Sequence, residues 1–175
     1  MIKEGIEEEM EYKEYLDNIE KKLQRYFDIE RDCTFNGYPL DLFAKFHFRN
    51  ERYVLSKKFV VYAYENHEYI FIRRFDEINE IHLKEFTDFL INSIDDVIEP
   101  DENHMSSVVT GVMVTDTKPS EEILETIKKF KYQKGFAFGF RGWVDIRLIL
   151  VSINNNYIIT NKKGKEVREV YSIKN

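Results

Sequence analysis

The sequence predicts an α+β fold, with three helices and one mixed β-sheet. Apolar residues recur every three or four positions over residues 6–28, 80–98 and 119–132, which is the spacing of an amphipathic helix. The segments between and after these helices are rich in Val, Ile and aromatic residues, and several alternate apolar with polar side chains as strands do. Turn-forming Gly, Pro and Asn residues separate the segments. The predicted order is α-βββ-α-β-α-β-βββ.

The first half of the chain is expected to hold one long helix and a meander of strands. The helix is predicted over residues 6–28, and Asn36-Gly37 predicts a turn after it. Residues 42–48 alternate in hydrophobicity and predict a strand. Residues 59–65 and 69–75 are predicted to pair as a hairpin around the turn between them.

The second half is expected to contain a parallel pair of strands and a C-terminal meander. Residues 107–115 and 136–140 predict strands on either side of a helix, and such a β-α-β unit makes a right-handed crossover between parallel strands. Residues 143–153 predict the longest strand. Shorter strands are expected over 157–160 and 166–173, with a tight turn between them.

Length and composition predict one domain, residues 1–175, in the cytoplasm. The chain has 175 residues, 43% of them hydrophobic, and neither a linker-like segment nor an internal repeat divides it. A single cysteine, Cys33, excludes an intrachain disulfide, and a buried apolar role is expected for it. The N-terminus does not resemble a signal peptide, and no apolar run approaches the ~20 residues that span a bilayer. No membrane partner is therefore expected.

Charge is distributed unevenly along the chain. The net charge is −6, but residues 126–175 hold 11 Lys and Arg against 3 Asp and Glu. Such asymmetry can create a face that binds anions. Alternatively, its sole effect is that the two halves of the fold attract each other.

The usual motifs of metal, nucleotide and hydrolase sites are missing from the sequence. His47, His67, His82 and His104 show no metal-binding spacing, and no cysteine accompanies them as in a zinc site. The chain lacks a Walker motif and the GxGxxG, GxSxG and HExxH patterns. We therefore predict neither a metal nor a cofactor, and a non-catalytic role is favoured over an enzymatic one.

One pattern suggests a nuclease. Pro100-Asp101 is followed 15 residues later by Asp116-Thr117-Lys118, and the predicted core order begins α-βββ-α-β. This combination resembles the restriction-endonuclease-like superfamily, in which two acids on neighbouring strands hold Mg²⁺ and a lysine assists the attacking water. The resemblance implies catalytic roles for Asp101, Asp116 and Lys118. Here the two acids flank a single predicted strand, which would keep them apart, so an inactive relative fits better than an active nuclease.

A second pattern combines charge and aromaticity on one strand. Trp143, Asp145 and Arg147 are expected to share a face, because alternate residues of a strand do so. Asp145 and Arg147 can form a local ion pair, which is the preferred interpretation. Alternatively, the three side chains can line a small-ligand site in which Arg147 takes an anion and Trp143 stacks on a ring.

A third pattern is the basic C-terminal region. Lysines late in the third helix, Arg141 and lysines in the last turn lie among aromatic residues, and such a surface can hold a nucleic-acid backbone. Ordinary solvated surface is the preferred interpretation. The residues are Lys128, Lys129, Lys131, Lys134, Arg141, Lys162, Lys163 and Lys165.

Three functions follow from these patterns, in order of preference. The first is a non-catalytic domain that binds a protein partner or itself through an aromatic-rich surface. The second is a nucleic-acid-binding domain, including a degenerate nuclease-like fold as one form of it. The third is a small-ligand site near Trp143, Asp145 and Arg147.

Overall fold

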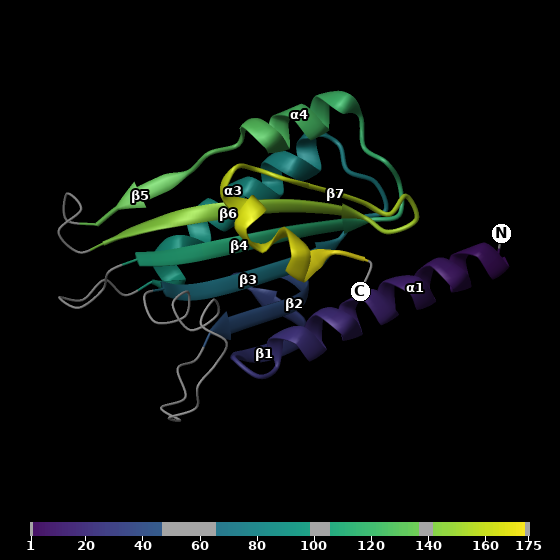
Figure 1. Cartoon of the computed structure of the whole chain (residues 1–175), viewed down its shortest axis with the longest axis horizontal. Helices are drawn as coiled ribbons and strands as arrows, with labels where there is room; N and C mark the ends of the chain where they lie inside the picture. The colour runs from purple at the N-terminus through teal and green to yellow at the C-terminus, as the bar shows by residue number, and fades with distance from the viewer. Residues whose placement is uncertain (1, 47–65, 99–105, 137–141, 174–175) are drawn as a thin grey trace.

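The described part of the chain is built on one seven-stranded mixed sheet (Figure 1). The computed structural model describes residues 2–46, 66–98, 106–136 and 142–173. Its elements are α1 (Ile2–Leu23), β1 (Phe27–Phe35), β2 (Tyr38–Phe46), β3 (Asn66–Arg74), α3 (Glu80–Val97), β4 (Ser106–Thr115), α4 (Glu121–Lys129), β5 (Gln133–Gly135), β6 (Trp143–Ser152), β7 (Tyr157–Thr160) and the 3₁₀ helix η2 (Lys163–Tyr171).

The strand order is β1-β2-β3-β4-β6-β5. The short strand β5 pairs with the start of β6, and β7 pairs with its end. The three N-terminal strands form an antiparallel meander, whereas β3, β4 and β6 are parallel to one another. The helices α3 and α4 make the two crossovers between these parallel strands. The predicted α+β class with a mixed sheet is therefore confirmed, and the order α-βββ-α-β is found through β4.

Two apolar layers sandwich the sheet. One layer packs α3 and α4 against one face, with Phe86, Leu90 and Leu124 among its fully buried side chains. The other packs α1 and η2 against the opposite face, and Ile19 and Tyr171 are nearly inaccessible there (Figure 1). Neighbouring residues of β6 alternate between the two layers, as a strand buried on both faces requires.

The first strand corrects an expectation. Residues 27–35 were predicted as the helix end and a loop, but they form β1, which is hairpin-paired with β2. Asn36 (φ 51°) and Gly37 (φ 78°) make the predicted turn, and both have the positive φ that a tight two-residue hairpin needs. Charged residues on the exposed side of β1 conceal its strand pattern, because this strand lies at the sheet edge.

The predicted helices α3 and α4 are confirmed, and side chains cap both N-termini. Asn79 accepts a hydrogen bond from the His82 amide, and Ser120 accepts one from the Ile123 amide. The strand β4 crosses beneath α3 at Gly111, where a Cβ would lie 2.2 Å from Leu90 Cδ1. The absence of a side chain at Gly111 therefore lets α3 approach the sheet.

Three other expectations are wrong in detail. The strand β3 begins at Asn66, where a turn was predicted, and its described neighbours are β2 and β4. The parallel partner of β4 is β6 rather than residues 136–140. Residues 166–171 belong to η2 instead of a strand, and Val167 and Val170 pack on the sheet at the three-residue spacing of a 3₁₀ helix.

Some expectations fall outside the described residues, namely the strand over 59–65 and most of the strand over 136–140. Within the described residues, none of the helices has the length and apolar character needed to cross a membrane.

Candidate functional site

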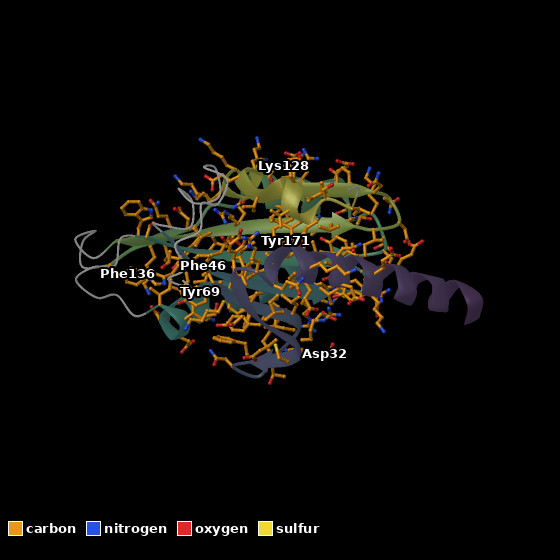
Figure 2. All side chains as sticks on the ribbon, turned by 60° about the horizontal axis from the view of Figure 1, so that its bottom comes forward. Asp32, Phe46, Tyr69, Lys128, Phe136 and Tyr171 are labelled. Atoms are coloured by element: carbon orange, nitrogen blue, oxygen red, sulfur yellow. The ribbon has the colours of Figure 1, made fainter. Side chains whose placement is uncertain are left out.

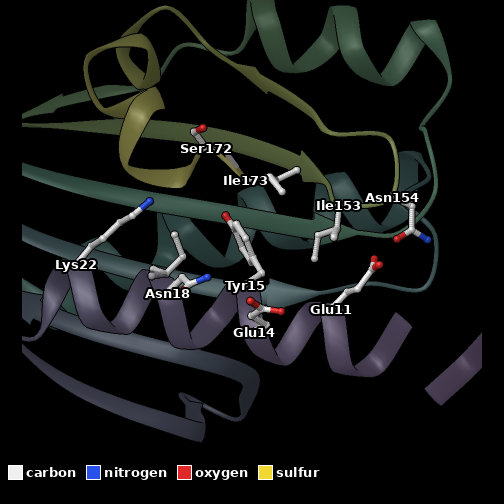
Figure 3. A pocket seen from close by; sticks show the side chains of 10 residues that line it. Glu11, Glu14, Tyr15, Asn18, Lys22, Ile153, Asn154, Ser172 and Ile173 are labelled. Atoms are coloured by element: carbon white, nitrogen blue, oxygen red, sulfur yellow. The ribbon is translucent and has the colours of Figure 1, made fainter. Parts of the chain in front are cut away.

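A groove separates α1 from the segment that follows η2 (Figure 3). Its volume is about 470 Å³. The floor is apolar, with Ile19 from α1 and Ile153 from the turn after β6 both buried. The rim is polar, and its side chains come from α1, the turn after β6 and the residue after η2: Glu11, Glu14, Asn18, Lys22, Asn154 and Ser172.

Two hydrogen bonds fix the walls of this groove. The Tyr15 hydroxyl donates to the Tyr171 carbonyl oxygen at 3.1 Å, and Lys22 Nζ donates to the Val170 carbonyl oxygen at 3.1 Å. Tyr15 is almost fully buried, and burial raises the pKa of its hydroxyl, which therefore stays protonated as a donor. The groove is thus bounded by two elements that are joined to each other.

The charge of the groove is divided between its ends. Glu11 and Glu14 lie one helical turn apart on α1, and both are exposed. Lys22 lies at the other end, where its ammonium group already contacts a backbone carbonyl. The acidic end therefore offers two solvent-accessible carboxylates beside an apolar floor.

A second polar cluster lies beneath α1 and surrounds Arg74, at the end of β3. The Arg74 guanidinium forms an ion pair with Asp116, and its Nε donates to Asp116 Oδ2 at 3.1 Å. The Arg74 backbone N–H donates to Asp41 Oδ2 on β2 at 2.8 Å. The guanidinium also stacks 4.9 Å from the Tyr12 ring, and burial followed by the Asp41 charge raises the pKa of Tyr12.

This cluster accounts for one of the three nuclease candidates. Asp116 is engaged by a guanidinium, which takes the place that a cation would need beside this carboxylate. Lys118 lies on the surface and pairs with Glu121 at 3.3 Å instead of pointing at Asp116. Asp101 lies outside the described residues. Among the residues described, no three His, Cys, Asp or Glu side chains are grouped to hold a metal.

Trp143, Asp145 and Arg147 alternate along β6, but their side chains lie in three different environments. Trp143 is exposed, and Asp145 accepts a hydrogen bond from Gln133 Nε2 at 3.0 Å. Arg147 is fully buried and pairs with Glu68 and Glu166, so the described ion pairs join it to other elements rather than to Asp145.

The Arg147 cluster connects the sheet to η2. Arg147 Nη1 lies 2.8 Å from Glu68 Oε1, and Arg147 Nη2 lies 3.1 Å from Glu166 Oε2. Thr110 on β4 donates to Glu68 Oε1 at 3.0 Å, and Lys163 Nζ lies 3.0 Å from Glu166 Oε1. The cluster therefore balances two cations with two carboxylates under the C-terminal segment.

Part of the basic surface is neutralised in ion pairs where the structure describes it. Lys128 on α4 lies 2.6 Å from Glu125, Lys134 pairs with Asp95, and Lys163 pairs with Glu166. Figure 2 shows Lys128 at the top of the view, away from Tyr171, which lies beside α1. Arg141 is outside the described residues. These pairs weaken the argument for a continuous phosphate-binding surface, and the nucleic-acid hypothesis stays a prediction.

Sequence patterns missed the residues that shape these sites. Glu68 was placed in a turn and Glu166 in a strand, and neither was connected with Arg147. Asn161 was assigned to a turn, yet it is buried and holds η2 to β6. The rim residues of α1 have the sequence pattern of an ordinary helix surface. They form a rim because the segment after η2 lies beside them, and the sequence does not show this position.

Comparison with known families identifies the chain. The model of a family described as "Domain of unknown function (DUF8052)" matches residues 11–173, so the chain belongs to this family. Searches of the curated proteins and of the solved structures returned no match. The resemblance to the restriction-endonuclease-like superfamily therefore stays a prediction.

Proposed function

We propose that this member of the DUF8052 family binds a short extended segment of a protein partner in the groove between α1 and the residues after η2. The observation that carries this proposal is the groove itself, which has an apolar floor and two exposed carboxylates at one end. A few polar groups around an apolar surface are the usual composition of a binding site.

The length of the groove favours a peptide. Its α1 wall runs from Glu11 to Lys22, which is ~16 Å at ~1.5 Å per helical residue. An extended chain advances ~3.3 Å per residue, so about five residues fit along this wall. The groove is therefore better matched to an extended segment than to a compact small molecule.

The charge of the groove favours a basic side chain at its acidic end. Glu11 and Glu14 can both approach one Lys or Arg, and a guanidinium can donate to two carboxylate oxygens at once. Ile173 lines the groove and is only partly buried, so it can pack against a neighbouring aliphatic side chain of the segment. The predicted partner segment therefore combines one basic and one aliphatic residue.

The test is an NMR titration with two capped pentapeptides. The first has the sequence Ala-Leu-Ala-Arg-Ala, and the second has Gln in place of Arg. Binding of the first should shift the amide signals of the groove, and it should weaken as salt screens the charges. The double variant Glu11→Gln with Glu14→Gln should lose this binding.

The matched control is Glu122→Gln with Glu125→Gln, which makes the same charge change at the same spacing on α4. This control should bind the Arg peptide like the unaltered protein. Equal binding of both double variants, or shifts that map away from the groove, would contradict the proposal.

A further inference from the structure

The starting point is the environment of Arg147, which is the largest fully buried side chain among the described residues. Its guanidinium lies between Glu68 on β3 and Glu166 on η2, at 2.8 and 3.1 Å. A buried charge is stable only when it is paired, because removing one partner leaves an uncompensated ion in a poorly solvated site. At least one anion must therefore accompany Arg147.

The two carboxylates differ in how firmly they are held. Glu68 belongs to the central part of the sheet, accepts a further hydrogen bond from Thr110, and is 16% exposed. Glu166 is 34% exposed and belongs to the surface segment η2. Glu166 is therefore the partner of Arg147 that can leave with the smaller rearrangement.

The Glu166 carboxylate is held as a bound anion would be. One of its oxygens faces Arg147 Nη2 at 3.1 Å, and the other faces Lys163 Nζ at 3.0 Å. A buried guanidinium and a half-exposed ammonium thus flank the same position from two sides. Both groups are donors without acceptor capacity, so they need an acceptor, and an anion also neutralises their charge.

We propose that Arg147 and Lys163 form a binding site for a phosphate group, and that the Glu166 side chain occupies this site when phosphate is absent. With Glu166 displaced, the described charges of Arg147, Lys163 and Glu68 sum to one net positive charge. Lys162, Lys165 and Arg168 lie in the same short segment and add to the attraction for an anion.

Phosphate suits this position because it offers several strongly accepting oxygens in different directions. A guanidinium and an ammonium group can each take a separate oxygen, as they now take the two oxygens of Glu166. The exchange keeps Arg147 paired throughout, since one anion replaces another. The site lies apart from the groove rim, so it does not depend on the proposed function.

The experiment compares Glu166→Ala with Glu169→Ala. Both variants remove one acid from η2, but only Glu166 contacts Arg147 and Lys163. Inorganic phosphate is titrated by calorimetry at constant ionic strength, and the Nε–Hε signal of Arg147 is followed by NMR. Because Glu166→Ala removes the carboxylate that competes for both donors, this variant should bind phosphate at least about tenfold more tightly than Glu169→Ala.

A second substitution tests whether the Lys163 ammonium group contributes to phosphate binding. Lys163→Gln, added to Glu166→Ala, should return phosphate affinity to the level of Glu169→Ala. Arg147 itself is left intact, because its removal would strand Glu68 and unfold the protein. Equal affinity of the Glu166→Ala and Glu169→Ala variants would overturn the proposal, as would tight binding that survives Lys163→Gln or leaves the Arg147 signal unmoved. Thermal melts confirm that each variant is folded.

Discussion

Asn161 fills a gap in the sheet, and its replacement gives the sharpest test of the fold around η2. The strand β6 pairs with β5 over residues 143–145 and with β7 over residues 149–152, so the edge between them has no strand partner among the described elements. The Asn161 amide lies in this gap. Its Oδ1 accepts from the Leu148 amide at 3.1 Å, and its Nδ2 donates to the Ile146 carbonyl at 2.9 Å.

The same side chain starts η2. Asn161 Oδ1 accepts a second hydrogen bond from the Gly164 amide at 2.8 Å, and Nδ2 donates a second to the Phe130 carbonyl at 3.3 Å. All four bonds are lost in Asn161→Ala. At a net ≈ 0.5–1.5 kcal/mol for each bond, the free energy of unfolding should fall by about 2–6 kcal/mol. For a chain of this length the loss corresponds to roughly 4–24 °C in Tm.

Urea unfolding followed by circular dichroism measures this loss, and the denaturant slope should stay constant because the fold is retained. Hydrogen exchange should become faster at the Leu148 amide than at amides of β4. Asn92→Ala is the matched control, since Asn92 is exposed on α3. A change in stability within about 0.5 kcal/mol for Asn161→Ala, similar to the scatter of surface substitutions, would refute the assigned role.

Three further predictions concern single positions. Gly111→Ala should lower the free energy of unfolding by about 1–3 kcal/mol, because its Cβ meets Leu90 Cδ1 at 2.2 Å, and this cost should shrink in a Leu90→Ala background. Tyr15→Phe should cost about 0.5–1.5 kcal/mol in urea unfolding and expose the segment after η2 to proteases, since the bond to Tyr171 is lost. Cys33 should react with a disulfide reagent at higher pH than free cysteine, because burial and the Glu30 charge raise its pKa, and an unshifted midpoint would contradict this.

The elements that sequence patterns predicted well are those with strong apolar periodicity. The strands β4 and β6 are buried on both faces and appear as Val- and Ile-rich runs. The helix α3 has a regular stripe of apolar residues, and Asn79 caps its N-terminus. Packing agrees with local preference in these segments, so single-sequence reasoning succeeds. The strand β1 was missed because its edge position leaves alternate residues exposed, and charges there resemble the surface of a continuing helix.

The candidate sites were less predictable, since their contacts join distant parts of the chain. Arg147 was paired with its neighbour Asp145, but its described carboxylate partners lie 79 and 19 residues away. Local spacing contains no information about such contacts. In the segment after Asn161, Val167 and Val170 are three residues apart, a spacing that matches η2 better than the two-residue alternation of a strand.

The two proposed sites lie on consecutive parts of one segment, the phosphate site on η2 and the groove wall on the residues after it, so their ligands should influence each other. Phosphate would release Glu166 from Arg147 and loosen the segment, whereas Ser172 and Ile173 must stay in place to wall the groove. We expect phosphate to weaken binding of the Arg pentapeptide, and the peptide to weaken phosphate binding by the same factor, as linkage requires. Titration of each ligand at saturating levels of the other measures both factors. Because Glu169→Ala retains Glu166, it should show the same coupling as the unaltered protein, while Glu166→Ala should show none. Coupling that persists in Glu166→Ala would mean that the segment after η2 responds to phosphate by another route.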